Sequence, residues 1–261
     1  MTILQACSLF VAALLGGALN AVAGGGSFFC FPALMLSGAP SAAANMTSTV
    51  ALWPASLSSV GAYRHDIQGQ RKEFLPLLAA SLLGGIIGAL VLVHLPGKTF
   101  EKFVPFLMLF ATLVFTLGRP LTQQLRSRVS ASGLPPQVTA IGGWMMQLMI
   151  AVYGGFFGGG IGMLMLALLT FRGMDNIHQM NALKNLLSAC INGIAILIFV
   201  GVGGILWPQA AIMVLGGLVG GYGGASYARR INPAQVRLLV SICGFAITAI
   251  FFARAFFTGG L

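Results

Sequence analysis

Acidic residues are almost missing from this chain of 261 residues. Only four Asp and Glu stand against fourteen Lys and Arg, and charged residues make up 7% of the sequence while apolar residues make up 57%. A soluble domain carries about 25% charged residues, so the composition excludes a soluble fold and predicts a polytopic membrane protein. The basic residues stand in short loops between apolar runs, so we interpret the net charge of +10 as a topology signal and expect no nucleic-acid partner.

Groups that carry common catalytic chemistry are missing from the apolar runs. All four acids are predicted in loops: Asp66, Glu73, Glu101 and Asp175. Their absence from the runs argues against a proton relay of buried carboxylates and against a divalent-cation site. The sequence also lacks GxxxxGK(S/T), HExxH and CxxC motifs, so we predict a protein that is not an enzyme and holds no metal or cofactor.

The apolar runs occur twice in the same order of lengths. The first five segments are 3–23, 27–37, 42–62, 74–95 and 103–118, and the second five are 139–157, 161–171, 179–200, 206–225 and 236–256. A glycine triplet stands at the same place in each half, at 24–26 and at 158–160. We therefore predict an internal duplication, with repeat 1 at 1–118, a cytoplasmic linker at 119–138 and repeat 2 at 139–261.

The second segment of each half is too short to cross a membrane, because its 11 residues span about 16 Å of a hydrocarbon core of about 30 Å. Each triplet is then either a kink in one long helix or the tip of a hairpin that returns the chain to the same side. The hairpin gathers ten of the basic residues on one face and leaves only Lys98, Lys102 and Arg254 on the other, so the positive-inside rule favours it. The predicted fold is an all-α polytopic membrane protein of two inverted repeats of five helical segments, the first two of each forming a Gly-tipped hairpin of discontinuous helices. Both termini are predicted to be periplasmic.

Three consecutive glycines within a membrane segment need a reason. Each destabilises a helix by about 1 kcal/mol relative to Ala, and irregular backbone at membrane depth is tolerated only where it faces protein or a water-filled cavity. A half-helix that begins at a triplet directs unpaired N–H groups and the positive end of its dipole into that cavity, which suits an anion. The alternative is close helix packing, the function that we predict for the glycines within 84–88 and 216–224.

Polar residues follow each short segment. The first half reads "NMTST" and the second half reads "NALKN", in which Asn181, Lys184 and Asn185 share one helix face. Lys184 either snorkels to the cytoplasmic surface or faces the cavity as the partner of an anion, and Ser188 and Asn192 continue the polar series. The predicted substrate-binding residues are Gly24, Gly25, Gly26, Ser27, Asn45, Thr47, Ser48, Gly158, Gly159, Gly160, Asn181, Lys184 and Asn185.

The duplicated pattern resembles the sulfite exporter TauE/SafE family, also called the toluenesulfonate uptake permease family. The similarity covers about 3–256 and depends on the two glycine-rich breaks, on the glycine after each short segment (Gly38 and Gly173) and on the two polar motifs. Pro32 matches the proline of the family's half-helix, whereas Leu166 stands near that place in the second half. The resemblance implies a bacterial or archaeal permease that carries sulfite, sulfoacetate or other small sulfur-containing or organic anions across the inner membrane.

We therefore expect a multi-pass protein of the bacterial inner (plasma) membrane that transports sulfite, an organosulfonate or a related sulfur oxyanion by alternating access. Its expected partners are the small anionic substrate and the lipid bilayer, and its glycine faces suit either internal packing or a homodimer. An anion channel with the same pore chemistry and a non-transporting membrane scaffold are the alternatives. Coupling through the protonation of the substrate itself, Na⁺ coupling at backbone carbonyls and uniport all agree with the sequence.

Overall fold

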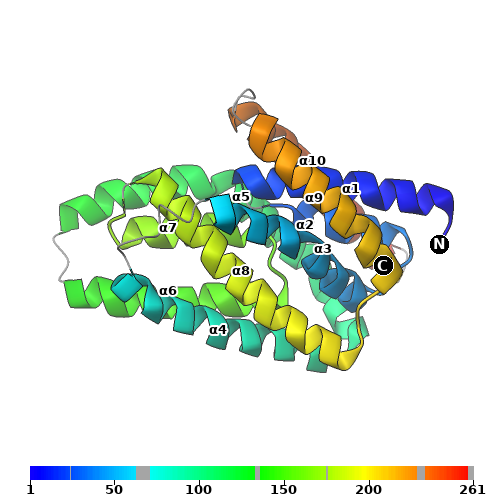
Figure 1. Cartoon of the computed structure of the whole chain (residues 1–261), viewed down its shortest axis with the longest axis horizontal. Helices are drawn as coiled ribbons and strands as arrows, with labels where there is room; N and C mark the ends of the chain where they lie inside the picture. The colour runs from blue at the N-terminus through cyan, green and yellow to red at the C-terminus, as the bar shows by residue number, and fades with distance from the viewer. Residues whose placement is uncertain (24, 63–70, 133–135, 175, 228–232, 258–261) are drawn as a thin grey trace.

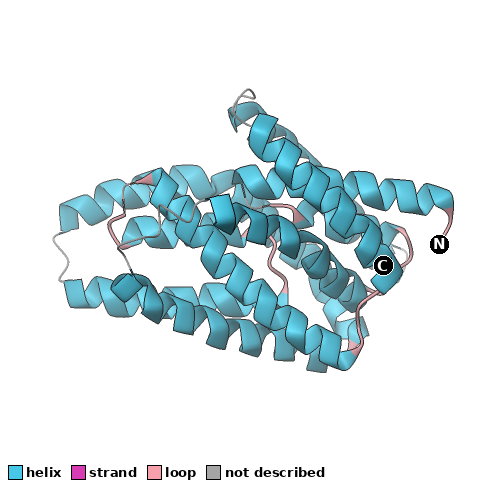
Figure 2. Ribbon diagram, in the orientation of Figure 1, coloured by secondary structure: helices cyan, strands magenta, loops and turns pink. Residues whose placement is uncertain are grey.

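A computed structural model describes the chain except residues 24, 63–70, 133–135, 175, 228–232 and 258–261. The described residues form ten α-helices and no strand (Figure 2). The helices are α1 (Ile3–Ala23), α2 (Ser27–Leu36), α3 (Ser41–Ala62), α4 (Arg71–His94), α5 (Gly97–Ser132), α6 (Pro136–Phe156), α7 (Ile161–Phe171), α8 (Ile177–Val202), α9 (Trp207–Tyr227) and α10 (Pro233–Phe257). The all-α class predicted from the sequence is confirmed.

Five of the helices, α1, α4, α5, α8 and α10, are long and apolar enough to cross a membrane. This finding confirms the prediction of a multi-pass membrane protein. Helices α2 and α7 are apolar but have only 10 and 11 residues, so neither reaches across a hydrocarbon core of about 30 Å.

The segment predicted as a linker is largely helical. Helix α5 continues through Arg119 and Pro120 to Ser132, and α6 begins at Pro136. The Gln, Leu and Arg residues beyond Pro120 are good helix formers, which explains why a polar composition does not end the helix. Two acids predicted in loops also lie in helices, because Glu73 belongs to the first turn of α4 and Glu101 to the first turns of α5.

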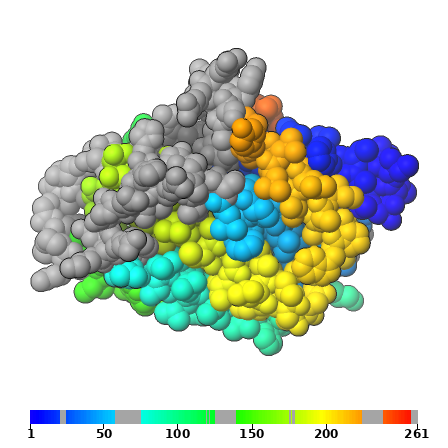
Figure 3. Space-filling model, viewed as in Figure 1, coloured from blue at the N-terminus to red at the C-terminus, as the bar shows by residue number. Residues whose placement is uncertain are grey.

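The helices of the two halves have matching neighbours. Helix α1 packs along α9 and α6 packs along α4, while α3 contacts α9 and α8 contacts α4. Helices α3 and α8 contact each other, and α5 packs against α10. The pairs of the first half therefore have counterparts in the second half: α1 with α9 corresponds to α6 with α4, and α3 with α9 corresponds to α8 with α4 (Figure 1). On the face in Figure 3, atoms of α8 (yellow) and α9 (orange) lie at the surface.

Glycines bring the long helices into backbone contact. A Cβ atom at Gly84 of α4 would lie 2.7 Å from the carbonyl oxygen of Leu148 in α6, and a Cβ atom at Gly216 of α9 would overlap the carbonyl oxygen of Phe10 in α1. Since any larger side chain would separate these helices, Gly84 and Gly216 serve packing inside the molecule.

Helix α2 runs back along α1. The Cys30 thiol lies 3.9 Å from the carbonyl oxygen of Ala12, and further from the turn Gln5 Nε2 donates to the carbonyl of Ser37 at 3.4 Å. The second half repeats the arrangement, because Ile161 lies beside Gly154 and Phe171 lies beside Gly142.

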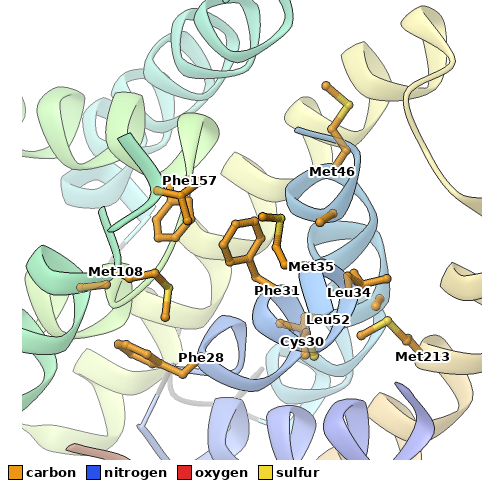
Figure 4. Packing of buried hydrophobic residues seen from close by; sticks show 14 of the residues in the cluster. Phe28, Cys30, Phe31, Leu34, Met35, Met46, Leu52, Met108, Phe157 and Met213 are labelled. Atoms are coloured by element: carbon orange, nitrogen blue, oxygen red, sulfur yellow. The ribbon is translucent and has the colours of Figure 1, made fainter. Parts of the chain in front are cut away.

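Aromatic side chains join the first short helix to the turn of the second half. The rings of Phe31 and Phe157 meet edge to face with centroids 5.3 Å apart, and Phe28 packs in the same way against Phe115 of α5 at 5.6 Å. These side chains belong to the buried cluster in Figure 4, which fixes α2 relative to the end of α6.

Candidate functional site

A polar cavity of about 40 Å³ lies between the two glycine-rich turns. Its polar lining comes from α1, α2, α3 and α8 and consists of Asn20, Ser27, Thr49, Ser56, Lys184, Asn185, Ser188 and Asn192. Its remaining lining residues are Leu52, Phe157, Gly158, Ile161 and Gly162. Residues from both halves of the chain therefore build one site.

Helices α3 and α8 present the same face to the cavity. Helix α3 contributes Thr49, Leu52 and Ser56, at intervals of three and then four positions. Helix α8 contributes Asn185, Ser188 and Asn192 at the same intervals, together with Lys184. Such intervals place side chains on one helix face. Trp53 Nε1 donates to the carbonyl of Ala189 at 2.9 Å, which joins the two helices beside the cavity.

Lys184 is the charged residue of the lining. Its side chain is only 2% exposed, so the structure places it in the cavity rather than at the surface. It makes no ion pair or hydrogen bond with another described residue, and no described acid lines the cavity. A buried ammonium without a partner is strongly destabilising, and a bound anion would supply the missing charge.

The turn between α6 and α7 requires glycine at two positions. Gly158 and Gly160 have φ angles of +78° and +76°, a left-handed conformation that residues with a Cβ atom rarely adopt. The amide of Ile161 donates to Gly158 at 3.5 Å, and that of Met163 donates to Gly160 at 3.1 Å. Among the described residues, no acceptor pairs with the amide of Gly162, which lines the cavity.

Two side chains bind carbonyl groups of this turn. The Tyr153 hydroxyl donates to the carbonyl of Gly159 at 2.7 Å, and Asn45 Nδ2 donates to the carbonyl of Phe156 at 2.8 Å. With these two carbonyls satisfied, the turn offers the amide of Gly162 to a ligand as an N–H donor. A helix N-terminus in this state favours an anion over a cation.

In the described part of the first turn, Gly25 and Gly26 have no left-handed φ angle, and close approach is what requires glycine. Gly26 precedes α2 with φ −57°, and a Cβ atom on it would lie 2.6 Å from the carbonyl oxygen of Gly16. Ser27, the first residue of α2, lines the cavity.

The structure brings four of the predicted site residues to the cavity wall: Ser27, Gly158, Lys184 and Asn185. Gly25, Gly26, Gly159 and Gly160 belong to the turns without lining the cavity, Asn181 is half-buried outside it, and Gly24 lies outside the described residues. The polar residues at the start of α3 are buried and bind protein groups instead. Thr47 Oγ1 accepts from the amide of Leu206 at 3.0 Å, and Ser48 Oγ donates to the carbonyl of Asn45 at 3.0 Å.

Five polar lining residues are absent from the predicted set. Thr49, Ser188 and Asn192 stand in polar stretches, and their helical spacing from Asn185 and Ser56 is the signal that identifies them. Asn20 is an isolated polar residue within an apolar run, and the structure joins it to Ser56 by a hydrogen bond of 3.0 Å from Asn20 Nδ2 to Ser56 Oγ.

Comparison with known proteins assigns the chain to a protein family. A sequence model described as "Sulfite exporter TauE/SafE" matches residues 9–251. The chain belongs to the sulfite exporter TauE/SafE family. This confirms the resemblance stated above, and it makes the chain a relative of membrane transporters.

Curated relatives of this TauE/SafE protein carry transporter names. The chain is 29% identical over 241 residues to "Probable membrane transporter protein ORF9" of Sinorhizobium sp., across 92% of this chain and 89% of that protein. It is 26% identical over 242 residues to a "Probable membrane transporter protein" of Haemophilus influenzae, across 92% of each chain. It is 27% identical over 243 residues to "Probable membrane transporter protein YfcA" of Escherichia coli K12, across 92% and 87%. No solved structure matches the chain.

Proposed function

We propose that the protein is a carrier for a small anion, and that Lys184 binds the anion in the cavity. The observation that supports this most is the buried position of Lys184 in a cavity that Gly162 also lines, with no described acid in the lining. A buried cation together with a helix N-terminus is a binding arrangement for negative charge.

The carrier fold that we propose consists of two inverted repeats. The matching helix neighbours of the two halves support the duplication, and the return of α2 along α1 and of α7 along α6 supports glycine-tipped hairpins. In each repeat of five segments, the short second segment returns the chain to the side of the membrane from which it entered. The two repeats then have opposite orientations, and both termini are periplasmic in the bacterial inner membrane. The glycine faces of α4 and α9 are covered inside the molecule, so the proposal includes no dimer.

The size of the cavity favours a small inorganic anion. A volume of about 40 Å³ holds about three water molecules, at the 10–15 Å³ that each needs by this measure. Sulfite, the anion in the family's name, has four heavy atoms, whereas an aromatic sulfonate would need the cavity to open. We therefore propose sulfite or a similar small oxyanion as substrate, moved by alternating access around the fixed site.

The experiment is anion flux into proteoliposomes that contain the purified protein. Wild-type protein is expected to take up sulfite, and Lys184→Met, which keeps the length and apolar stem of the side chain, is expected to abolish most of this flux. Lys98→Met, at an exposed position, is the matched control and keeps the flux. Unchanged flux in Lys184→Met would exclude the proposed role, and unitary currents in a voltage-clamped bilayer would replace the carrier by a channel.

A further inference from the structure

Three hydroxyl groups of the cavity wall already donate their hydrogen to the protein. Thr49 Oγ1 donates to the carbonyl of Asn45 at 2.9 Å, Ser56 Oγ donates to the carbonyl of Leu52 at 3.2 Å, and Ser188 Oγ donates to the Met165 sulfur at 3.3 Å. A hydroxyl group has one hydrogen and two lone pairs. These three side chains therefore offer a ligand only acceptors.

Acceptors gather on the side of the cavity formed by α1 and α3, which we call the acceptor side (Asn20, Thr49 and Ser56). Asn20 Nδ2 donates one of its two N–H groups to Ser56 Oγ at 3.0 Å, and the carbonyl oxygen of Asn20 is a further acceptor. We call the side-chain N–H groups of Lys184 and Asn185 and the amide N–H of Gly162 the donor side, because none of them donates a hydrogen bond within the described protein.

A fully deprotonated oxyanion finds no donor in the hydroxyl groups of Thr49 and Ser56. All of its atoms accept hydrogen bonds, so it pairs with the donor side and directs lone pairs at Thr49 and Ser56. An oxyanion that keeps one O–H group pairs with both sides. Since an unpaired buried polar group is costly, the two-sided lining discriminates between the two forms.

We propose that the cavity selects its anion in the singly protonated form, with the O–H of the ligand donated to the acceptor side and its charged oxygens bound by the donor side. This inference rests on the proposed anion carrier and adds the protonation state of its substrate. For sulfite, the bound species is hydrogensulfite, and one proton then crosses the membrane within each transported anion.

Apart from the Lys184 ammonium, the neighbouring described groups give no other route for that proton. Lys184 is the charged group among the described lining residues. On the helices around it, Tyr153 donates to Gly159, the Cys30 thiol lies against Ala12, and Cys190 lies half-buried outside the lining. No described carboxylate lines the site, so the ligand itself is the proton carrier.

The test is sulfite uptake into proteoliposomes at several pH values around neutrality, corrected with protein-free liposomes. In one series the total sulfite is adjusted to keep hydrogensulfite constant, and in the other to keep the dianion constant. The initial rate is expected to stay level in the first series and to fall with rising pH in the second. A rate that follows the dianion, or total sulfite at every pH, overturns the inference. Sulfate, which carries no proton near neutral pH, is expected to compete poorly, and equal competition also contradicts it.

Variants of the acceptor side test the same point. Thr49→Val and Ser56→Ala are each expected to raise the apparent KM for hydrogensulfite roughly tenfold and to weaken the preference over the dianion. Thr248→Val removes a buried hydroxyl that donates to the carbonyl of Gly244 in α10, and it is the matched control that changes neither value. If both acceptor-side variants keep the wild-type preference for hydrogensulfite over the dianion, the inference is wrong. Wild-type protein without flux of any anion instead rejects the proposed function, so the two failures are distinguishable.

Discussion

The two halves of the chain share their helix pairings but reach the cavity differently. Gly17 of α1 contacts α9 in the way that Gly155 of α6 contacts α4. Ten positions separate Gly17 from Ser27, and six separate Gly155 from Ile161, so the first half is longer by four residues, about one helical turn. Asn20 lies in this extra turn and lines the cavity. An insertion in one half thus adds a polar group that the other half lacks.

The positive charge of the site also comes from one half of the chain only, among the described residues. The lining residues of α3 and α8 match in spacing, and in this match Lys184 of α8 corresponds to Ser48 of α3. Ser48 is buried and bonded to its own helix, whereas Lys184 has no described partner. The shared frame therefore positions the cavity, and differences between the halves give it a donor side and an acceptor side.

The largest effect is expected from the charge. Lys184→Met should lower sulfite flux at subsaturating concentration by about a hundredfold, since losing one partner of a buried charged contact costs 2–5 kcal/mol or more. Ser48→Ala, at the corresponding position of the other half, should change flux by less than about twofold because its hydroxyl makes only a local bond. Equal losses of sulfite flux in the two variants, measured in proteoliposomes, would mean that the two halves contribute equally to anion binding.

The second-largest effect is expected from alanine substitutions in the two glycine-rich turns, which should differ in strength. Gly160→Ala forces a side chain into a left-handed conformation (φ +76°), which costs about 1–2 kcal/mol, so the initial rate should fall roughly tenfold with a lower melting temperature. Gly25→Ala meets the side chains of Phe115 and Phe28 at 3.1 and 3.2 Å, which can shift slightly, and it should have the smaller effect. The reverse order in rates and thermal unfolding would contradict the difference between the turns.

A few-fold effect is expected where Tyr153 holds the second turn. Tyr153→Phe removes only the hydroxyl that donates to Gly159, a bond that contributes about 1 kcal/mol, so the apparent KM should rise about fivefold. Tyr222→Phe, at a residue that is 83% exposed, should leave KM unchanged. A normal KM in Tyr153→Phe would show that the turn keeps its shape without this bond.

The smallest effect concerns helix packing. Gln147 of α6 donates to Ser81 of α4 at 2.7 Å, but its carbonyl oxygen is buried without a partner among the described residues. The corresponding positions of α1 and α9 hold Leu9 and Met213, both buried. Replacing both polar partners by apolar groups is often neutral or stabilising, so Gln147→Leu with Ser81→Ala should stabilise the protein by about 1 kcal/mol. A lower melting temperature in detergent would indicate that the amide has a partner in the membrane.

Much of the frame could be predicted from the sequence, because apolar runs and glycine triplets report directly on helices and turns. The short helices α2 and α7 and the cavity positions of Ser27, Lys184 and Asn185 follow from those patterns. The contacts of the other polar side chains do not follow from the sequence, since they depend on which helices pack against each other. Asn45 and Thr49 stand one turn apart on α3, yet Asn45 reaches Phe156 in the other half while Thr49 lines the cavity. Asn20 could not be predicted because its role depends on the extra turn of α1.

The contact between Gly17 and Gly217 has a consequence for biogenesis. The two residues are 200 positions apart in the sequence, so α1 enters the membrane long before α9 has been synthesised. Membrane helices associate after they have inserted, and until α9 arrives the glycine face of α1 borders lipid or the insertion machinery. Assembly of the bundle thus waits for the last part of translation, and chains that end before α9 should be recognised as incomplete and degraded by membrane proteases.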